Sequence, residues 1–416
     1  MRKSTHIDER GITMKAVMYG GGNIGRGFIG MLFSQSGYHT TFVDVAAPVV
    51  DGLNEKGKYP VRIISGDTHE DIDIINVCAV NGNDTAAVAA AIADADIMAT
   101  AVGVNILKFI IPNLVAGIRL RKETNKGPLN ILICENLMDA NKVLEGMLKA
   151  ELTSEEIDWF DENIGLVEAT IGRMVPVQTE EMKDGDPLRV CVEKYGFLPV
   201  DGYAFKGEVP KIKNMIPFSP FDFYIKRKLY IHNMGHATCA YLGDLFGLTY
   251  IYEAIDRDDI YIIVKNAMQE SAQVLSKHYG VALNGILDHI DDLLMRFTNK
   301  ALMDTCKRVG GDPKRKLSPA DRLIGAASLA LKNEIIPAYI CIGAGAALKR
   351  YLNEADMEQT VENACSVLQE ISQLDETCEL TKLILAYYQL ILDGATLSQI
   401  RRIADNHKAA GLVDVI

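Results

Sequence analysis

The stretch KLYIHNMGH holds three side chains that together could do chemistry, spaced as KxxxxNxxH: Lys228, Asn233 and His236. They offer an amine, a carboxamide and an imidazole, three groups that can form hydrogen bonds with a small polar substrate. At about 100° per residue of α-helix, Lys228 and His236 lie about 80° and about 12 Å apart, so one small substrate could touch all three. The alternative is a partly exposed helix with a solvated lysine and a satisfied histidine.

The surroundings of Lys228 decide whether its amine can lose its proton at neutral pH. Because a lysine normally titrates near ~10.4, partial desolvation or cationic neighbours are needed at neutral pH. We expect Lys226, Arg227 and an imidazolium at His232 or His236 to provide them. Gly235, next to His236, would remove a side chain where another group needs to approach.

A second chemical feature is the basic segment KRVGGDPKRKLSPADRL, residues 307–323. Its cations are Lys307, Arg308, Lys314, Arg315, Lys316 and Arg322. Guanidinium groups bind phosphate monoesters in a bidentate manner and lysine adds a point charge, so the segment suits a phosphorylated ligand. We assign Arg315 and Arg322 to the phosphate; the alternative is a solvated loop with ordinary surface charges.

A glycine-rich turn lies near the start of the chain, in KAVMYGGGNIGRGFIG, residues 15–30. Gly20, Gly22 and Gly25 fit GxGxxG between an apolar run and a helical pattern. In this motif the first glycine permits a tight turn, the second lets a pyrophosphate approach the backbone, and the third lets the helix pack on the sheet. The helix N-terminus then offers N–H groups to the anion.

Asp44, at the end of the next apolar run, strengthens this interpretation. A carboxylate there accepts hydrogen bonds from a ribose 2′-hydroxyl and repels a 2′-phosphate, which favours NAD over NADP. The alternative is a turn without a ligand in which Asp44 caps a helix. The residues predicted to bind NAD are Gly20, Gly22, Asn23, Ile24, Gly25, Asp44 and Val45, with Val102 and Gly103 at the end of another run.

The elements that carry these residues alternate between strand and helix patterns through the first half of the chain. Strands are expected at 16–20, 40–45, 71–80, 96–103 and 129–136, and helices at 24–37, 84–93, 104–122 and 138–150. Such alternation predicts a doubly wound, mostly parallel α/β sheet of the Rossmann type. Runs at 165–177 and 188–200 look like further strands of that sheet.

The domain organisation follows from a change of pattern near the proline-containing stretch 209–222, after which the sequence is helical. We expect an NAD-binding domain at 14–210, with additional strands, and a helical substrate and catalytic domain at 211–416. Residues 1–13 are polar and are expected to be a leader or an expression remnant. The apolar window 97–118 contains Lys108 and Pro112, so a buried strand followed by a helix is expected there rather than a membrane span.

The composition limits the partners. A formal net charge of −12 argues against nucleic acid, and no membrane association is expected. The eight cysteines are scattered without CxxC pairs or metal-ligand spacing, as is typical of a reduced cytoplasmic protein, and no metal site is predicted. We expect a monomer or a weak homo-oligomer that binds a small molecule.

Several motifs together resemble the polyol-specific long-chain dehydrogenases. They are MKAVMYGGGNIGRGFIG, FVDV at 42–45, CEN at 134–136, the KxxxxNxxH helix and the basic segment, in this order and spacing. The resemblance implies a metal-independent, NAD-dependent hydride transfer between a polyol and a ketose. It implies that Lys228 is the catalytic base, that Asn233 and His236 fill the other motif positions, and that Asn136 is a second amide near the reacting oxygen. It also implies that Arg308 and Lys316 contact the polyol chain.

The expected reaction is the interconversion of D-mannitol 1-phosphate and D-fructose 6-phosphate. Segment 178–222 resembles the family poorly, so free mannitol with fructose, or a hexuronate such as fructuronate or tagaturonate, stays open as the substrate. Two further alternatives are a zinc-dependent polyol dehydrogenase and a non-catalytic NAD sensor. The sensor would leave Lys228, Asn233 and His236 without a role.

Overall fold

The computed structural model describes residues 13–410 and divides the chain into two compact units. The first unit ends at Phe221 and the second begins at Asp222. The predicted leader lies outside the described residues, apart from Thr13. No helix within 13–410 is long and apolar enough to cross a membrane.

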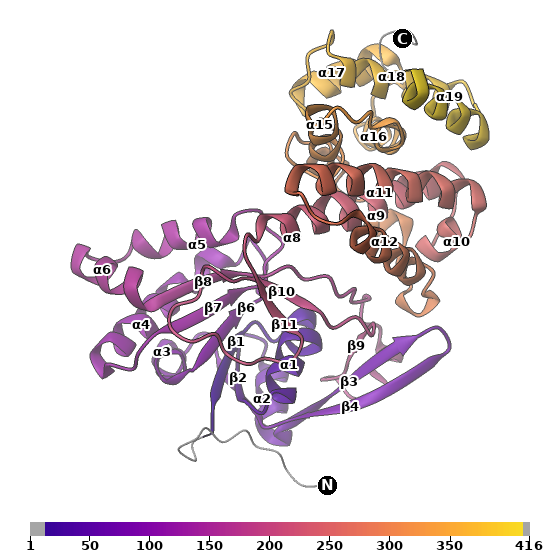
Figure 1. Cartoon of the computed structure of the whole chain (residues 1–416). Helices are drawn as coiled ribbons and strands as arrows, with labels where there is room; N and C mark the ends of the chain where they lie inside the picture. The colour runs from indigo at the N-terminus through magenta and orange to yellow at the C-terminus, as the bar shows by residue number, and fades with distance from the viewer. Residues whose placement is uncertain (1–12, 411–416) are drawn as a thin grey trace. The chain divides into compact units, whose positions relative to one another are not determined.

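The first unit is built on a six-stranded sheet in which every neighbouring pair is parallel. The strands lie in the order β5-β2-β1-β6-β7-β8 (Figure 1). Their bounds are β1 Lys15–Tyr19, β2 His39–Asp44, β5 Val77–Asn81, β6 Ile97–Thr100, β7 Leu129–Ile133 and β8 Ile164–Glu168. Numbered along this sheet alone the order is 3-2-1-4-5-6, which is that of the dinucleotide-binding doubly wound fold. The predicted fold class is therefore confirmed.

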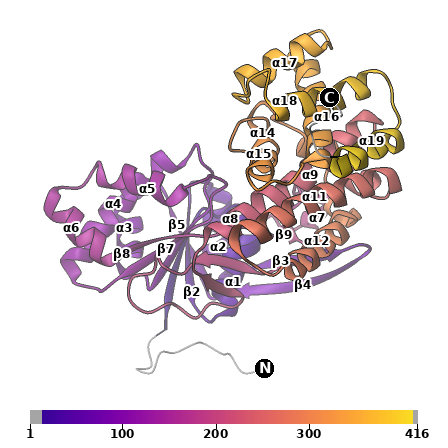
Figure 2. The same cartoon turned by 45° about the horizontal axis from the view of Figure 1, so that its top comes forward.

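Two apolar cores cover the two faces of this sheet. Successive side chains of a strand point to opposite faces, and in β1 Ala16 and Met18 enter one core while Val17 and Tyr19 enter the other. The first core includes η1 Gly25–Gly30, α1 Met31–Gln35 and α2 Ala47–Lys56. The second includes α3 Thr85–Asp94, α4 Leu107–Thr124, α5 Ala140–Lys149 and α6 Ser154–Asn163. Helices α3 and α4 lie side by side in both views (Figure 1, Figure 2).

Two small sheets differ from the sequence prediction. The run 71–80 is not one strand: Asn76, in the left-handed conformation with φ 58°, separates β4 from β5. Strand β4 Thr68–Ile75 forms a hairpin with β3 Lys58–Ser65, which also pairs with β9 Val190–Val192. Strands β10 Leu198–Asp201 and β11 Met215–Phe218 form the other sheet, and α7 is Glu180–Lys183. Of the two runs expected to extend the main sheet, only the first contributes a strand to it, β8.

The second unit is helical. Its helices are α8 Asp222–Arg227, η2 Lys228–Asn233, α9 Met234–Leu245, α10 Ile251–Ile255, α11 Asp258–Tyr279, α12 Leu283–Phe297, η3 Lys300–Leu302, α13 Cys306–Val309, α14 Pro313–Lys316, α15 Ile324–Lys332, α16 Ala338–Glu354, α17 Val361–Glu370, α18 Glu379–Leu392 and α19 Leu397–Ala410. The packed centre is formed by α9, α11 and α16. This confirms the expected helical C-terminal domain.

Glycines let these central helices approach closely. A Cβ on Gly235 would lie 2.6 Å from Met268 Sδ of α11, and one on Gly343 of α16 would lie 2.4 Å from Thr238 Oγ1 of α9. Both distances are shorter than real side-chain contacts. Helix α9 can therefore approach α11 and α16 this closely only because Gly235 and Gly343 have no side chain. The group that approaches beside Gly235 is therefore the Met268 side chain.

Candidate active site

The glycine-rich turn is tightly packed at Gly20 and Gly25 and open at Gly22. Gly20 has φ +101°, and a Cβ on it would lie 2.5 Å from the Ala101 carbonyl oxygen. A Cβ on Gly25 would lie 1.8 Å from the Gly20 carbonyl oxygen. Gly22, in contrast, is exposed and has no atom within 4 Å of its Cβ position. This arrangement fits a pyrophosphate that approaches bare backbone at Gly22 while the helix packs closely on the strand.

The helix after the turn brings a buried cation close to it. The Nε of Arg26 donates a hydrogen bond of 2.6 Å to the Gly21 carbonyl, and its guanidinium also donates to the Leu188 carbonyl. Burial lowers the pKa of Arg26, although the nearby Tyr59 and Asp44 act in the opposite direction. Sequence reasoning did not select Arg26, because nothing in the motif shows that this side chain turns back toward the glycines. Exposed Asn23 and half-buried Ile24 lie between Gly22 and Gly25.

Asp44 is tied to the same turn. Its Oδ2 accepts a hydrogen bond of 2.7 Å from Gly21 N–H, and its Oδ1 accepts one of 2.9 Å from Ala46 N–H just before α2. The carboxylate is therefore held by two backbone N–H groups, but it does not cap α2, whose N-cap residue is Ala46 and which has no side-chain cap. A carboxylate has about four lone-pair sites, so it can still accept hydrogen bonds from a ribose. Val45, next along the chain, is 66% exposed.

A buried glutamate connects the ends of β6 and β7. The carboxylate of Glu135 accepts hydrogen bonds from Val102 N–H at 2.9 Å and Gly103 N–H at 2.8 Å. Asn136, the predicted second amide, follows Glu135 and is exposed. Glu135 was not selected from the sequence, although it lies in the CEN motif. The predicted cofactor residues and Asn136 all lie at or just after the carboxyl ends of parallel strands, where ligands bind in such folds.

In the second unit the predicted catalytic helix is not a regular α-helix. Residues Lys228–Asn233 form a π-helix, in which hydrogen bonds join residues i and i+5. This pattern places Asn233 one turn after Lys228 on the same side, so the angles and the separation calculated for an α-helix do not apply. Lys228, Asn233 and His236 are all partly exposed. Single π-turns inside α-helices occur frequently at functional sites.

The expected cationic environment of Lys228 is partly wrong. Lys226 forms an ion pair of 2.6 Å with Asp222 and donates a hydrogen bond to Tyr279. His232 is buried, and burial lowers its pKa well below the ordinary value, with Arg296, His236 and Lys228 acting in the same direction. His232 is therefore neutral at neutral pH, so it adds no charge beside Lys228.

His236 and Arg308 meet at one carboxylate. His236 Nε2 lies 3.4 Å from Asp304 Oδ2, and its ring stacks on Phe297 at 4.7 Å between centroids. Arg308 Nε donates a hydrogen bond of 2.8 Å to Asp304 Oδ1. Burial raises the pKa of Asp304, but the histidine and the arginine together outweigh it and hold the pKa below its ordinary value. Asp304 was not selected from the sequence.

Three further predicted site residues, Arg315, Lys316 and Arg322, lie near a second carboxylate, Asp321. Arg315 Nη1 lies 3.2 Å from Asp321 Oδ2, and Arg322 Nε donates a hydrogen bond of 2.8 Å to Asp321 Oδ1. Lys316 is 4% exposed and donates to the Gly311 carbonyl. Burial, followed by Arg322 and Arg315, lowers the pKa of Lys316 to about 8. Lys316 and Arg322 are thus buried, whereas the exposed cations of the segment match the solvated-loop alternative: Lys307, Arg308, Lys314 and Arg315.

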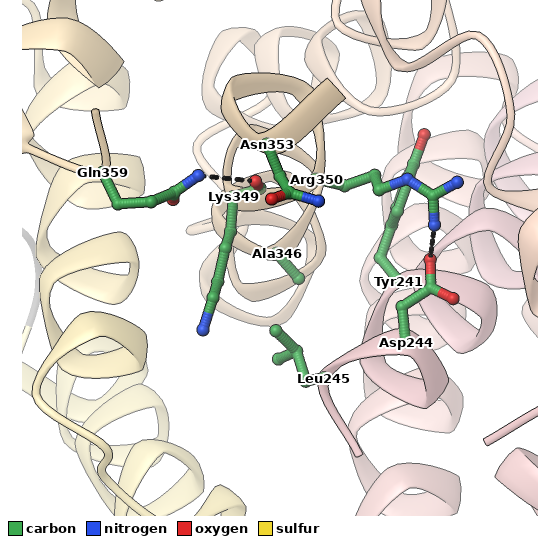
Figure 3. A pocket seen from close by; sticks show the side chains of 8 residues that line it. All are labelled: Tyr241, Asp244, Leu245, Ala346, Lys349, Arg350, Asn353 and Gln359. Atoms are coloured by element: carbon green, nitrogen blue, oxygen red, sulfur yellow. Dashed lines mark hydrogen bonds and ion pairs between the residues drawn. The ribbon is translucent and has the colours of Figure 1, made fainter. Parts of the chain in front are cut away.

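A pocket of about 350 Å³ lies at the other end of α9 (Figure 3). In it Arg350 reaches Asp244, and Gln359 Nε2 donates to the Lys349 carbonyl at 3.1 Å. Its lining is Tyr241, Asp244, Leu245, Ala346, Lys349, Arg350, Asn353 and Gln359. It contains none of the predicted site residues. Across residues 13–410, no group of three or more His, Cys, Asp or Glu side chains could hold a metal ion.

Comparison with known proteins covers nearly the whole chain. Residues 14–214 match the mannitol dehydrogenase Rossmann domain, and residues 221–389 match the mannitol dehydrogenase C-terminal domain. The mannitol-1-phosphate 5-dehydrogenase of Brevibacillus brevis is 39% identical over 335 residues, which are 80% of this chain and 86% of that protein.

Two solved structures share the fold. Substrate-free D-sorbitol dehydrogenase has a TM-score of 0.77 at 15% identity, covering 95% of this chain and 96% of the other. The mannitol 2-dehydrogenase of Pseudomonas fluorescens, solved as a ternary complex with NAD and D-mannitol, has a TM-score of 0.73 at 14% identity, covering 94% of each chain.

These matches define an NAD-dependent oxidoreductase that acts on polyols. The chain belongs to the mannitol dehydrogenase family. The expectation of an NAD-using polyol dehydrogenase is confirmed, and the matches favour an enzyme over the alternative of a non-catalytic NAD sensor.

Proposed function

We propose that the chain interconverts D-mannitol 1-phosphate and D-fructose 6-phosphate, with Lys228 as the general base. The observation that carries the phosphate preference is the grouping of Arg315, Lys316 and Arg322 around Asp321. Tyr230 of the π-helix lies beside this group, because its hydroxyl donates to the Ala320 carbonyl at 3.4 Å. The 39% identity to a mannitol-1-phosphate 5-dehydrogenase supports the same substrate.

Bound NAD supplies the acceptor for the hydride of the alcohol carbon. Gly22 and Asp44 hold its pyrophosphate and its ribose in this proposal. Lys228 Nζ takes the proton of the substrate hydroxyl, so the C–O bond becomes a carbonyl when the hydride leaves. The amides of Asn136 and Asn233 donate hydrogen bonds to the oxygen while negative charge develops on it, and loss of one such donor typically costs about 100- to 1000-fold in rate.

The other residues orient the substrate. Arg308, His236 and Lys316 hold the hydroxyl groups of the polyol chain, and Arg315 and Arg322 hold the phosphate. We propose that no nucleic acid is bound, consistent with a net charge of −12, and that the protein is a monomer or weak homo-oligomer of a reducing compartment. The eight cysteines, all within the described residues, are free thiols, which supports that compartment.

The substrate is tested by NADH oxidation with fructose 6-phosphate, fructose and fructuronate. The proposal expects kcat/KM to be highest with fructose 6-phosphate. A higher value with fructose or fructuronate would transfer the function to a mannitol 2-dehydrogenase or a hexuronate reductase.

The base is tested with two variants of Lys228. Lys228→Ala removes the amine, while Lys228→Arg keeps the positive charge on a group that does not deprotonate in proteins. We expect both variants to lose about 100- to 10,000-fold in kcat while still binding NADH, because a base contributes about that factor. Substantial activity in Lys228→Arg would mean that the site needs a charge at this position and not a base.

A further inference from the structure

Asp304 contacts two predicted substrate residues, one with each carboxylate oxygen. Oδ2 lies 3.4 Å from His236 Nε2, and Oδ1 accepts a hydrogen bond of 2.8 Å from Arg308 Nε. A second guanidinium nitrogen of Arg308 also donates to Oδ1. The Asp304 side chain is 7% exposed, whereas that of Arg308 is 50% exposed. The carboxylate thus lies in the interior and holds groups that reach toward the surface.

The backbone of Asp304 is fixed. Its carbonyl accepts a hydrogen bond of 2.9 Å from Ile251 N–H, and the next residue, Thr305, forms an antiparallel bridge with Tyr250. Thr305 also caps α13, with its side chain accepting from Arg308 N–H at 3.1 Å. A carboxylate on such a segment has little freedom to move, so it can hold more mobile side chains in a fixed position.

The His236 ring is held on its face and at its edge. Phe297 stacks on it with an interplanar angle of 16°, which fixes the plane of the imidazole. A carboxylate beside Nε2 favours the tautomer with the proton on that nitrogen, so Nδ1 is left as the acceptor. A hydroxyl group of the substrate could then donate to Nδ1. Without the carboxylate, neither the tautomer nor the ring orientation would be selected.

We infer that Asp304 is a positioning residue that fixes both the His236 imidazole and the Arg308 guanidinium for substrate binding. This inference rests on the proposed function of the same site. Asp304 itself would touch no substrate, and its effect would act through the two side chains that it holds.

The first test compares Asp304→Asn with Asp244→Asn. Asparagine keeps the size of the side chain but removes its charge and replaces one acceptor oxygen by an NH₂ donor, so Arg308 and His236 can no longer both be held by acceptor oxygens. We expect kcat/KM with fructose 6-phosphate to fall about 10- to 100-fold, since a displacement of about 1 Å costs up to about 100-fold. Asp244 is a matched control because it is also partly buried and pairs with one arginine, Arg350. Its variant should stay within about twofold of the wild type; equal losses in both would overturn the inference.

The second test asks whether Asp304 acts through His236. We expect the double variant Asp304→Asn with His236→Ala to lose much less than the product of the two single losses, because residues that act as a unit are not additive. Additive losses would show independent roles and overturn the inference.

A third test needs no turnover. Long-range ¹⁵N–¹H spectra report the tautomer of each histidine, and His236→Ala identifies the His236 signals. We expect the proton on Nε2 in the wild type and in Asp244→Asn, and a changed pattern in Asp304→Asn. An identical His236 pattern in all three proteins would overturn the inference. If the wild type reduces none of the three sugars, the proposed function fails, and these spectra still decide the positioning role.

Discussion

Gly22 and Gly25 of the glycine-rich turn give opposite predictions for replacement by alanine. A methyl group on Gly22 meets no atom within 4 Å, and Gly22 has no left-handed φ, so Gly22→Ala should fold normally. A methyl group on Gly25 would lie 1.8 Å from a backbone oxygen, although real Cβ atoms stay beyond 3.0 Å. The start of the helix would have to move by the difference, about 1.2 Å.

The expected magnitudes follow from these contacts. Overpacking costs about 1–3 kcal/mol, and we expect Gly25→Ala to lie at about the upper end, because its neighbour is backbone that cannot rotate away. Gly22→Ala should leave stability unchanged or raise it by up to about 1 kcal/mol, since alanine restricts the unfolded chain. If the pyrophosphate contacts Gly22, the same overpacking cost appears in binding, which corresponds to a rise of roughly 5- to 150-fold in the Kd for NADH.

The assay is thermal melting combined with fluorescence titration of NADH. Gly146→Ala is the control, because this glycine of α5 also has open space at its Cβ position and lies outside the predicted cofactor residues. We expect Gly146→Ala to leave the Kd for NADH unchanged and to change the Tm by no more than a few degrees. An unchanged Kd in Gly22→Ala would refute the assignment of the open face to the phosphate, whatever the result for Gly25→Ala.

Three further predictions concern charged side chains. Asp44→Ser should raise the ratio of kcat/KM for NADP to that for NAD by about 10-fold or more, because the charge that repels a 2′-phosphate is gone; an unchanged ratio in steady-state assays would contradict this role. Lys316, whose pKa is lowered to about 8, should lose its charge above that pH. Because it lies beside Arg322 and Arg315, the positive potential at the proposed phosphate site should then fall, so KM for fructose 6-phosphate should rise there more steeply than KM for fructose. Because the folded state then binds fewer protons than the unfolded state between about pH 8 and 10.5, stability should rise through that window, and Lys316→Met should remove the rise in denaturant titrations. Glu270→Ala should cost about 3–5 kcal/mol at pH 8, measured by urea unfolding, because Tyr339 N–H, Ile340 N–H and the ammonium of Lys408 lose a fully buried acceptor; a loss below about 1 kcal/mol would contradict this.

Several features were readable from the sequence because they depend on local chemistry. The Gly20 turn needs a residue that tolerates positive φ, and its glycines recur at fixed spacing between a strand and a helix. The alternation of apolar strands with amphipathic helices predicted a parallel sheet, and the structure has one. The apolar window 97–118 was correctly interpreted as a strand and a helix, β6 and α4.

Other features were missed because the local pattern did not distinguish them. Residues 71–80 form one β-rich run, and only the left-handed Asn76 divides it between two sheets. An apolar periodicity likewise does not separate a π-turn from an α-turn, so the geometry of Lys228–Asn233 was calculated for the wrong helix.

By itself, the sequence determined which groups are present and which of them lie near one another along the chain. The tertiary structure decided which charges are buried, paired or neutral. Asp304 and Glu135 are ordinary acids in the sequence, and become central only where folding brings His236 and Val102 to them. From the sequence, Lys226 and His232 were expected to be cationic neighbours of Lys228. In the folded chain Lys226 contacts Asp222 and Tyr279, and burial keeps His232 neutral. The physical reason is that the pKa of a group depends on solvation and on charges within a few ångströms, and both are properties of the folded chain.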